Sequence, residues 1–131
     1  MGCFLTQAEA VLGVIDEERL QANALDVGGY LKSALESLKD RHALIGDVRG
    51  MGLFAGAELV QDRATKEPVS EKHVGAIVAD CMAQGVIIGA TNRSLPGYNN
   101  TLLFAPSLVA TADDLDHITS AVDAAITRVL G

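Results

Sequence analysis

The sequence predicts an α/β (α+β) fold, a two-layer sandwich in which a small, mostly antiparallel sheet has its helices packed on one face. Three observations predict it. Apolar residues recur at helical spacing in four stretches, β-prone apolar runs lie between them, and glycine, proline and polar residues separate the runs. The predicted order is α-α-β-β-α-β-β-α, within 131 residues that suit one domain.

The two helices predicted near the N-terminus differ in how much of their surface is apolar. The first, over residues 4–16, is apolar on most sides, which predicts that other protein covers it. The second, over residues 20–40, contains Gly28 and Gly29, each costing about 1 kcal/mol relative to alanine, which indicates close packing against another backbone. Its single apolar stripe consists of Leu20, Ala24, Val27, Leu31, Leu35 and Leu38.

The stretch over residues 44–60 is predicted to form the central pair of strands. Gly50 and Gly52 lie between two apolar runs and permit backbone angles that a side chain would forbid. With Gly56 they miss the dinucleotide-binding spacing by one residue, and strand-like residues follow where a phosphate-binding loop needs a helix. We therefore interpret these glycines as part of a kinked or bulged strand pair whose backbones approach closely.

The third predicted helix begins after Ser70, whose side chain can cap it, and ends at Gly85. Residues 86–88 are predicted to form a short buried strand. Residues 89–100 are rich in turn-forming side chains and are predicted to form a loop.

The last predicted strand and helix are separated by a proline. Residues 101–105 are β-prone and stop at Pro106. Thr111 is predicted to cap the final helix, and Asp113 and Asp114 lie in its first turn, where carboxylates interact favourably with the helix dipole. The buried stripe of this helix consists of Leu115, Ile118, Val122, Ile126 and Val129.

The composition argues against several classes of function. The formal net charge of -7 disfavours binding to nucleic acid and to anionic membrane surfaces, which attract basic proteins. No apolar run reaches the roughly 18 residues of a membrane span, and we expect no signal peptide. Cys3 and Cys81 lie far apart without a CxxC motif, so we expect reduced, buried thiols in a cytoplasmic protein; a disulfide is the open alternative.

No group of residues shows a recognisable catalytic or metal-binding pattern. The histidines, His42, His73 and His117, lack metal-ligand spacing, and no nucleophile–histidine arrangement occurs. The lysines stand in polar contexts, unlike a desolvated amine that forms a Schiff base. We therefore expect no catalytic residue and no metal site in this chain. The lysines are Lys32, Lys39, Lys66 and Lys72.

Two arginines are candidate ligands for a carboxylate, because a guanidinium on a rigid scaffold can clamp that planar group. Arg49 lies beside the glycine pair, among apolar neighbours, and Arg49, Gly50 and Gly52 are together predicted to be structural or to line a pocket. The favoured alternative for Arg49 is a structural hydrogen-bond donor that ties down loops. Arg93 lies in the loop between two strands, and its alternative is simple exposure to solvent.

A longer motif begins at Ile45 and reads Ile45-Gly46-Asp47-Val48-Arg49-Gly50-Met51-Gly52-Leu53-Phe54. It resembles the start of the small C-terminal domain of the class III aminotransferases, which are pyridoxal-phosphate enzymes of fold type I. Later segments resemble that family in the same order, so the resemblance covers essentially the whole chain. These segments are Glu58-Leu59-Val60, Thr65-Lys66-Glu67-Pro68, Cys81 through Val86, and Phe104-Ala105-Pro106-Ser107-Leu108-Val109.

The resemblance implies that residues 1–19 are the helix connecting a missing large domain to the small domain, and that residues 20–131 are the small domain. The family's cofactor, pyridoxal 5'-phosphate, is bound mainly by the large domain, and the lysine that holds it has no counterpart here. We therefore expect the C-terminal portion of such an enzyme, inactive and colourless alone. Its partners are the large domain and further copies in a homo-oligomer, a dimer in the full enzyme. A contiguous apolar face on the first helix would be unusual for a monomer.

The resemblance also implies a reaction in the full enzyme. An amine or ω-amino acid donates its amino group and a keto acid such as pyruvate accepts it, while the small domain closes over the substrate. In the ω-amino-acid:pyruvate branch, a mobile arginine shortly before the final strand binds the substrate carboxylate, and Arg93 lies in the corresponding connection. Leu103 stands where many other members carry an arginine, which favours the pyruvate branch.

Two other functions stay open at this point. The chain could be a stand-alone, non-catalytic binding or regulatory module with the same fold. The full enzyme could instead catalyse another pyridoxal-phosphate reaction, as an aminomutase, epimerase or decarboxylase. An in-frame large domain upstream of Met1 would favour a portion of an enzyme over the module.

Overall fold

The computed structural model describes the backbone of residues 2–131 and the side chains from Phe4 onward. The Cys3 thiol therefore lies outside the described side chains, whereas Cys81 is a buried, free cysteine. The elements run in the order α1 (Gly2–Glu17), α2 (Leu20–Arg41), β1 (Ile45–Met51), β2 (Phe54–Asp62), β3 (Glu67–Pro68), α3 (Glu71–Ala83), β4 (Gly89–Ala90), β5 (Thr101–Phe104) and α4 (Ala112–Leu130). This confirms the predicted order and adds the short strand β3.

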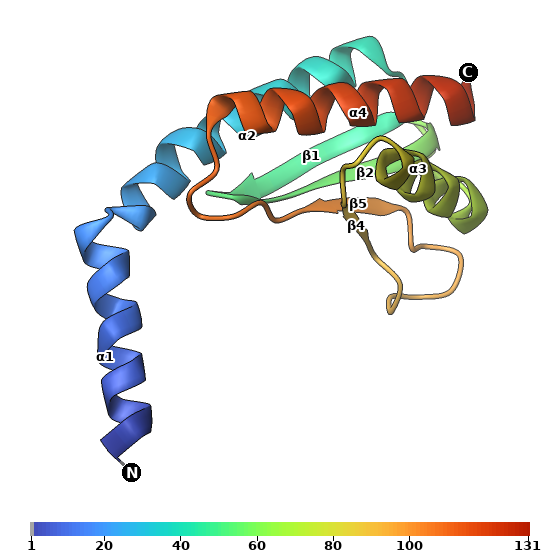
Figure 1. Ribbon diagram of the computed structural model, residues 1–131. Coiled ribbons are helices and arrows are strands. Elements are labelled where there is room, and N and C mark those ends of the chain that lie inside the picture. The colour runs from blue at the N-terminus through green and yellow to red at the C-terminus, as the bar shows by residue number, and fades with distance from the viewer. Residues whose placement is uncertain (1) are drawn as a thin grey trace.

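One antiparallel sheet forms the lower layer of the sandwich (Figure 1). Its strand order is β1-β2-β5-β4, β3 pairs with β2, and every pairing is antiparallel. Helices α2 and α4 lie side by side over the sheet, and α3 packs against α4. The predicted two-layer sandwich is confirmed.

The core lies between the sheet and the helices, because apolar residues alternate along the strands and recur along the helices. From α2, Leu31, Leu35 and Leu38 are almost fully buried. They meet strand residues such as Val48 and Ala57 in one cluster. The opposite side of the strands, which we call the open face, carries the exposed Asp47, Arg49 and Phe54 of β1 and β2.

Helix α1 extends away from the sandwich (Figure 1). The chain turns between α1 and α2 at Arg19, whose φ of 52° is left-handed. Large apolar side chains on α1 are exposed, as the sequence predicts for a helix that other protein covers. They are Phe4, Leu5, Val11, Leu12 and Val14.

Helix α2 and the β1–β2 turn meet backbone to backbone. A Cβ on Gly28 would lie 2.2 Å from the carbonyl carbon of Gly52, which confirms the predicted close packing at Gly28. The prediction is wrong for Gly29, which faces open space with nothing within 4 Å of an added Cβ. Gly50 and Gly52 both have positive φ, and strand β2 follows them directly, so they form the hairpin turn of the predicted strand pair, whose backbones approach closely at Gly50.

The strand predicted over residues 86–88 is wrong in position. Val86 and Ile88 are buried and Ile87 is exposed, but pairing begins only at β4, where Gly89 faces Leu103. Continuing that register would place Val86 opposite Pro106, which has no N–H to donate to the ladder.

The helix ends agree with the sequence. The Ser70 side chain accepts a hydrogen bond from the backbone of His73, and Thr111 forms a capping box with Asp114. Among residues 2–131, no helix combines the length and the apolar character that crossing a bilayer requires.

Candidate functional site

Arg49 lies on the open face of the sheet and is paired within it. Its Nη1 donates to Oδ2 of Asp47 at 2.7 Å and to Oε2 of Glu58 at 2.7 Å. The hydrogen bond from Arg49 holds the pKa of Asp47 below its ordinary value, and the two carboxylates raise the pKa of Arg49. The guanidinium therefore bridges two neighbouring strands and is neutralised by its own sheet.

A shallow hollow of about 400 Å³ lies beside Arg49 on the open face. We call it the sheet-face hollow, and it is lined by Arg49, Gly50, Phe54, Ala55, Gly56, Thr91, Thr101 and Leu103. A Cβ on Gly56 would lie 3.2 Å from Cγ2 of Thr101, so the lack of a side chain at Gly56 leaves space in the hollow. Gly52 does not line it, because the hairpin turn places that residue against Ala24 of α2.

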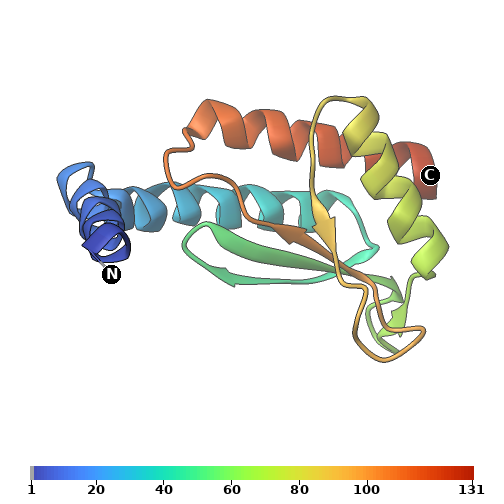
Figure 2. The same cartoon turned by 60° about the horizontal axis from the view of Figure 1, so that its bottom comes forward.

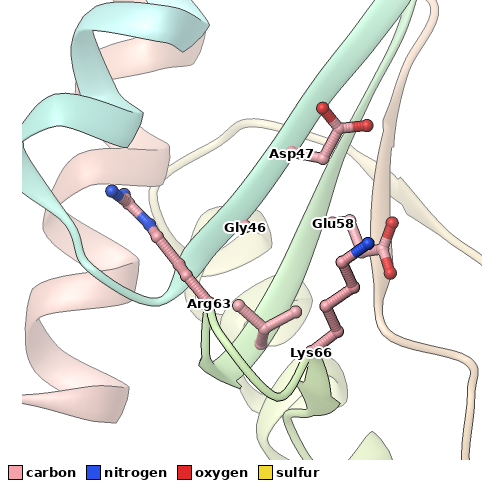
Figure 3. A pocket seen from close by; sticks show the side chains of 6 residues that line it. Gly46, Asp47, Glu58, Arg63 and Lys66 are labelled. Atoms are coloured by element: carbon pink, nitrogen blue, oxygen red, sulfur yellow. The ribbon is translucent and has the colours of Figure 1, made fainter.

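A second hollow of about 270 Å³ lies further along β1 and β2 and is shown in Figure 3. Asp47, Glu58 and Lys66 line it, so its charges are mixed. The Arg63 guanidinium points away from it towards the helices (Figure 3). Arg63 donates to the backbone carbonyls of Ile45 and His42, which ties it to the end of α2. This hollow presents no uniform charge to a ligand.

Arg93 lies in the loop between β4 and β5, which we call the Arg93 loop (residues 91–100). Its side chain is exposed, and no carboxylate within residues 2–131 pairs with it. Arg93 does not line the sheet-face hollow, but Thr91 of the same loop does. The structure thus brings Arg49 and Gly50 together at the hollow and places the start of the Arg93 loop at its edge.

The Arg93 loop is held by polar side chains that sequence reasoning assigned no such role. Glu71 accepts hydrogen bonds from the backbone N–H of Gly97 and from Nδ2 of Asn99. Asn100 is 4% exposed and donates to the carbonyl of Leu59 at 2.6 Å. These partners lie tens of residues apart in sequence, so no local pattern in the sequence indicates them.

The side chains that the structure describes, from Phe4 onward, do not form an enclosed site for pyridoxal 5'-phosphate. The cofactor needs an enclosed lysine amine. Lys32, Lys66 and Lys72 are exposed, and Lys39 pairs with Glu36 at 3.7 Å on the surface. Over residues 2–131, no three His, Cys, Asp or Glu side chains are grouped to hold a metal ion.

Two of the three histidines, His42 and His73, lie at helix ends. His42 Nε2 lies 2.5 Å from Oδ1 of Asp123, which connects the end of α2 to α4. His73 Nδ1 lies 3.1 Å from Oγ of Ser70 at the start of α3. His117 is exposed on α4.

The family model described as Aminotransferase class-III matches residues 4–126. The chain is 55% identical over 130 residues to a hypotaurine/taurine–pyruvate aminotransferase of Paracoccus denitrificans, covering 98% of this chain and 28% of the relative. It is 45% identical to a taurine–pyruvate aminotransferase of Bilophila wadsworthia, with the same coverage of 98% and 28%. The chain thus spans 28% of the length of these curated relatives.

Solved structures agree in fold. A Bacillus anthracis aminotransferase superposes with a TM-score of 0.87 at 35% identity, over 90% of this chain and 26% of that one. An amine transaminase from an uncultivated Pseudomonas species, in its PLP-bound form, superposes with a TM-score of 0.83 at 31% identity, over 93% of this chain and 26% of that one.

Proposed function

We propose, from the premise that this chain belongs to the class III aminotransferase family, that it is the small C-terminal domain of a pyridoxal-phosphate-dependent enzyme. That enzyme transfers an amino group from an amine or ω-amino acid to a keto acid such as pyruvate. The match over residues 4–126 establishes the premise. The observation that carries the proposal is 55% identity, over 98% of this chain, to a relative whose name gives hypotaurine, taurine and pyruvate as substrates.

We further propose that Arg93 binds the acid group of the substrate. Four of the six arginines are occupied: Arg41, Arg49 and Arg128 pair with carboxylates, and Arg63 donates to carbonyls. Among the described side chains, Arg19 and Arg93 form no ion pair, and Arg93 belongs to the loop whose first residue, Thr91, lines the sheet-face hollow. A guanidinium offers two parallel N–H donors, which match the oxygens of a carboxylate or a sulfonate.

The domain division is also a proposal. Residues 1–19 would connect the domain of residues 20–131 to a preceding large domain. The support is the uncovered apolar surface of α1, where Phe4 is 79% exposed and Leu5 is 73% exposed. A surface of this kind is unusual unless another part of the protein covers it. We propose that the large domain of the same polypeptide does so, and that the full enzyme is a homodimer.

Pyridoxal 5'-phosphate would be bound outside these residues, since no lysine here is enclosed. When bound, the cofactor supplies the electron sink for amino transfer. This chain would bind and orient the acid end of the substrate through Arg93 and exclude water by closing over the site. We place the enzyme in the cytoplasm; the support is the free thiol of Cys81, since reducing compartments preserve thiols.

The test is an assay of the full-length enzyme that carries this chain. Purified enzyme with pyridoxal 5'-phosphate and pyruvate is given taurine, a carboxylate-bearing ω-amino acid, or an aralkyl amine, and alanine formation is measured. We expect alanine from at least one donor, and none from the 131-residue chain alone. Absence of alanine with every donor, in an enzyme that binds the cofactor, would overturn the proposal.

A further inference from the structure

The Arg93 loop has almost no apolar packing of its own. Every side chain from Asn92 to Tyr98 is exposed, including Leu95 at 66% and Tyr98 at 57%. Figure 2 shows the loop extending beyond the strands that it connects. A hollow of about 370 Å³, lined by residues of both elements, lies between the loop and α3. Because side-chain packing does not fix this segment, its conformation depends on hydrogen bonds.

The two ends of the loop are fixed to the sheet. The N–H of Thr91 donates to the carbonyl of Thr101 at 2.9 Å, and the N–H of Thr101 donates to Oγ1 of Thr91 at 3.2 Å. At the other end, the N–H of Leu59 donates to the carbonyl of Asn100, while Nδ2 of Asn100 donates to the carbonyl of Leu59. These bonds anchor residues 91 and 100 but do not reach the middle of the loop.

The middle of the loop is held from α3 by one carboxylate. Oε1 of Glu71 accepts from the N–H of Gly97 at 2.8 Å and from Nδ2 of Asn99 at 2.9 Å. Oδ1 of Asn99 then accepts from the N–H of Ser94 at 3.0 Å. The chain of bonds therefore runs from α3 through Asn99 to the residue next to Arg93.

We propose that Glu71 is a positioning residue for Arg93, holding the loop so that the guanidinium faces the acid group of the substrate. This inference rests on the proposed role of Arg93. Bidentate recognition of a carboxylate or sulfonate depends on orientation, because both N–H donors must meet both oxygens together. Releasing the loop would leave Arg93 its charge but free the backbone segment that carries it.

Glu71 also lies in the first turn of α3, where a carboxylate stabilises the helix dipole. That structural role would not distinguish one substrate from another, since it acts on the helix alone. Ser70 already caps this helix by accepting from the N–H of His73. The ordinary ionised state of Glu71 suits the positioning role, because the N–H of Gly97 and then Asn99 lower its pKa.

The test compares variants of the full-length enzyme with acid-bearing and neutral donors. For Glu71→Ala we expect the KM of taurine and of a carboxylate-bearing ω-amino acid to rise about three- to tenfold. The KM of an aralkyl amine should stay unchanged. Glu71→Gln should recover most of the loss, because both bonds converge on one oxygen that the amide retains. Lys72→Ala, on the same turn and exposed, is the matched control.

The double variant separates this inference from the role of Arg93. In an Arg93→Ala background, Glu71→Ala should cause no further rise in KM, since its effect passes through Arg93. If Arg93→Ala raises the KM of acid-bearing donors but Glu71→Ala does not, the positioning role is wrong and the role of Arg93 stands. If Arg93→Ala changes no KM, both fail.

A second readout is independent of activity. Hydrogen exchange of the full-length enzyme should show faster exchange at the amides of Ser94 and Gly97 in Glu71→Ala than in Lys72→Ala. Equal exchange in the two variants would show that Glu71 does not hold the loop, and would overturn the inference.

Discussion

Arg49 and Arg93 stand in contrasting surroundings within one small domain. Arg49 projects from a strand and shares its guanidinium between Asp47 and Glu58. Arg93 projects from a loop and pairs with no carboxylate in residues 2–131, although hydrogen bonds donated to Glu71 hold that loop. The contrast shows that Arg49, whose charge is paired within the sheet, stabilises the fold. The Arg93 charge has no such partner among the described residues and lies on a loop held by hydrogen bonds, so it is available to a ligand.

The largest expected effect on KM comes from removing the unpaired guanidinium of Arg93. For Arg93→Ala in the full-length enzyme, we expect the KM of acid-bearing donors to rise about ten- to hundredfold. A lost charge-assisted pair corresponds to about 1.5–3 kcal/mol. The matched control is Arg19→Ala, which removes the same charge at the α1–α2 junction and should leave KM unchanged. Equal changes in both variants would mean that only net charge matters.

The second prediction concerns the rigidity of the sheet that carries Arg49. Gly28→Ala places a Cβ 2.2 Å from the Gly52 carbonyl carbon, so helix and hairpin must separate. We expect the free energy of unfolding of the 131-residue chain to fall by about 1–3 kcal/mol in urea titrations. Gly29→Ala is the control: it meets open space and should raise stability by up to about 1 kcal/mol. A Gly28→Ala chain as stable as its parent would contradict this packing.

The third prediction tests the structural role of Arg49 directly. Arg49→Ala removes the two ion pairs on the open face, where the Arg49 side chain is 54% exposed. Pairs this accessible to solvent contribute about 0.2–1 kcal/mol, so we expect a stability loss below about 1 kcal/mol. The KM of acid-bearing donors should change far less than in Arg93→Ala. A larger KM effect for Arg49→Ala than for Arg93→Ala would reverse the assignment of the two arginines.

The smallest expected effect is a pH dependence. Arg49 lowers the pKa of Asp47 in the folded state, so this carboxylate stabilises the fold at pH values above its unfolded pKa of about 3.9. That contribution is lost as the pH falls through the lower, folded pKa. In Asp47→Asn, the free energy of unfolding should therefore fall less steeply with decreasing pH below about pH 4. Its pH dependence near neutral pH should be unchanged. The free energy of unfolding of both chains, measured in urea at several pH values, provides the comparison. If it falls below about pH 4 equally in the two chains, Asp47 makes no such contribution.

Local chemistry explains how much of the fold the sequence could predict. The caps at Ser70 and Thr111 and the positive φ of Gly50 and Gly52 depend on neighbouring residues, and each was predictable. Gly29 could not be told from Gly28, because which glycine faces the hairpin depends on how α2 is rotated against the sheet. The start of β4 depends on its pairing with β5, which ends at Phe104, and this is a contact between distant residues.

The candidate site was less predictable than the fold. The position of Arg93 in a loop before the last strand was visible in the sequence. The hydrogen bonds that hold the loop were not, since Glu71 and Asn99 are 28 residues apart and both belong to types common on surfaces. The partners of Arg49 depend equally on strand register, which places Asp47 opposite Glu58.

The most direct test of this account is a crystal structure of the full-length enzyme with an acid-bearing substrate or product analogue bound. We predict that the guanidinium of Arg93 donates to the acid group of the analogue, with Glu71 still accepting from Gly97, and that the large domain covers the apolar side chains of α1. An acid group held by another cation, with Arg93 in solvent, would contradict the account.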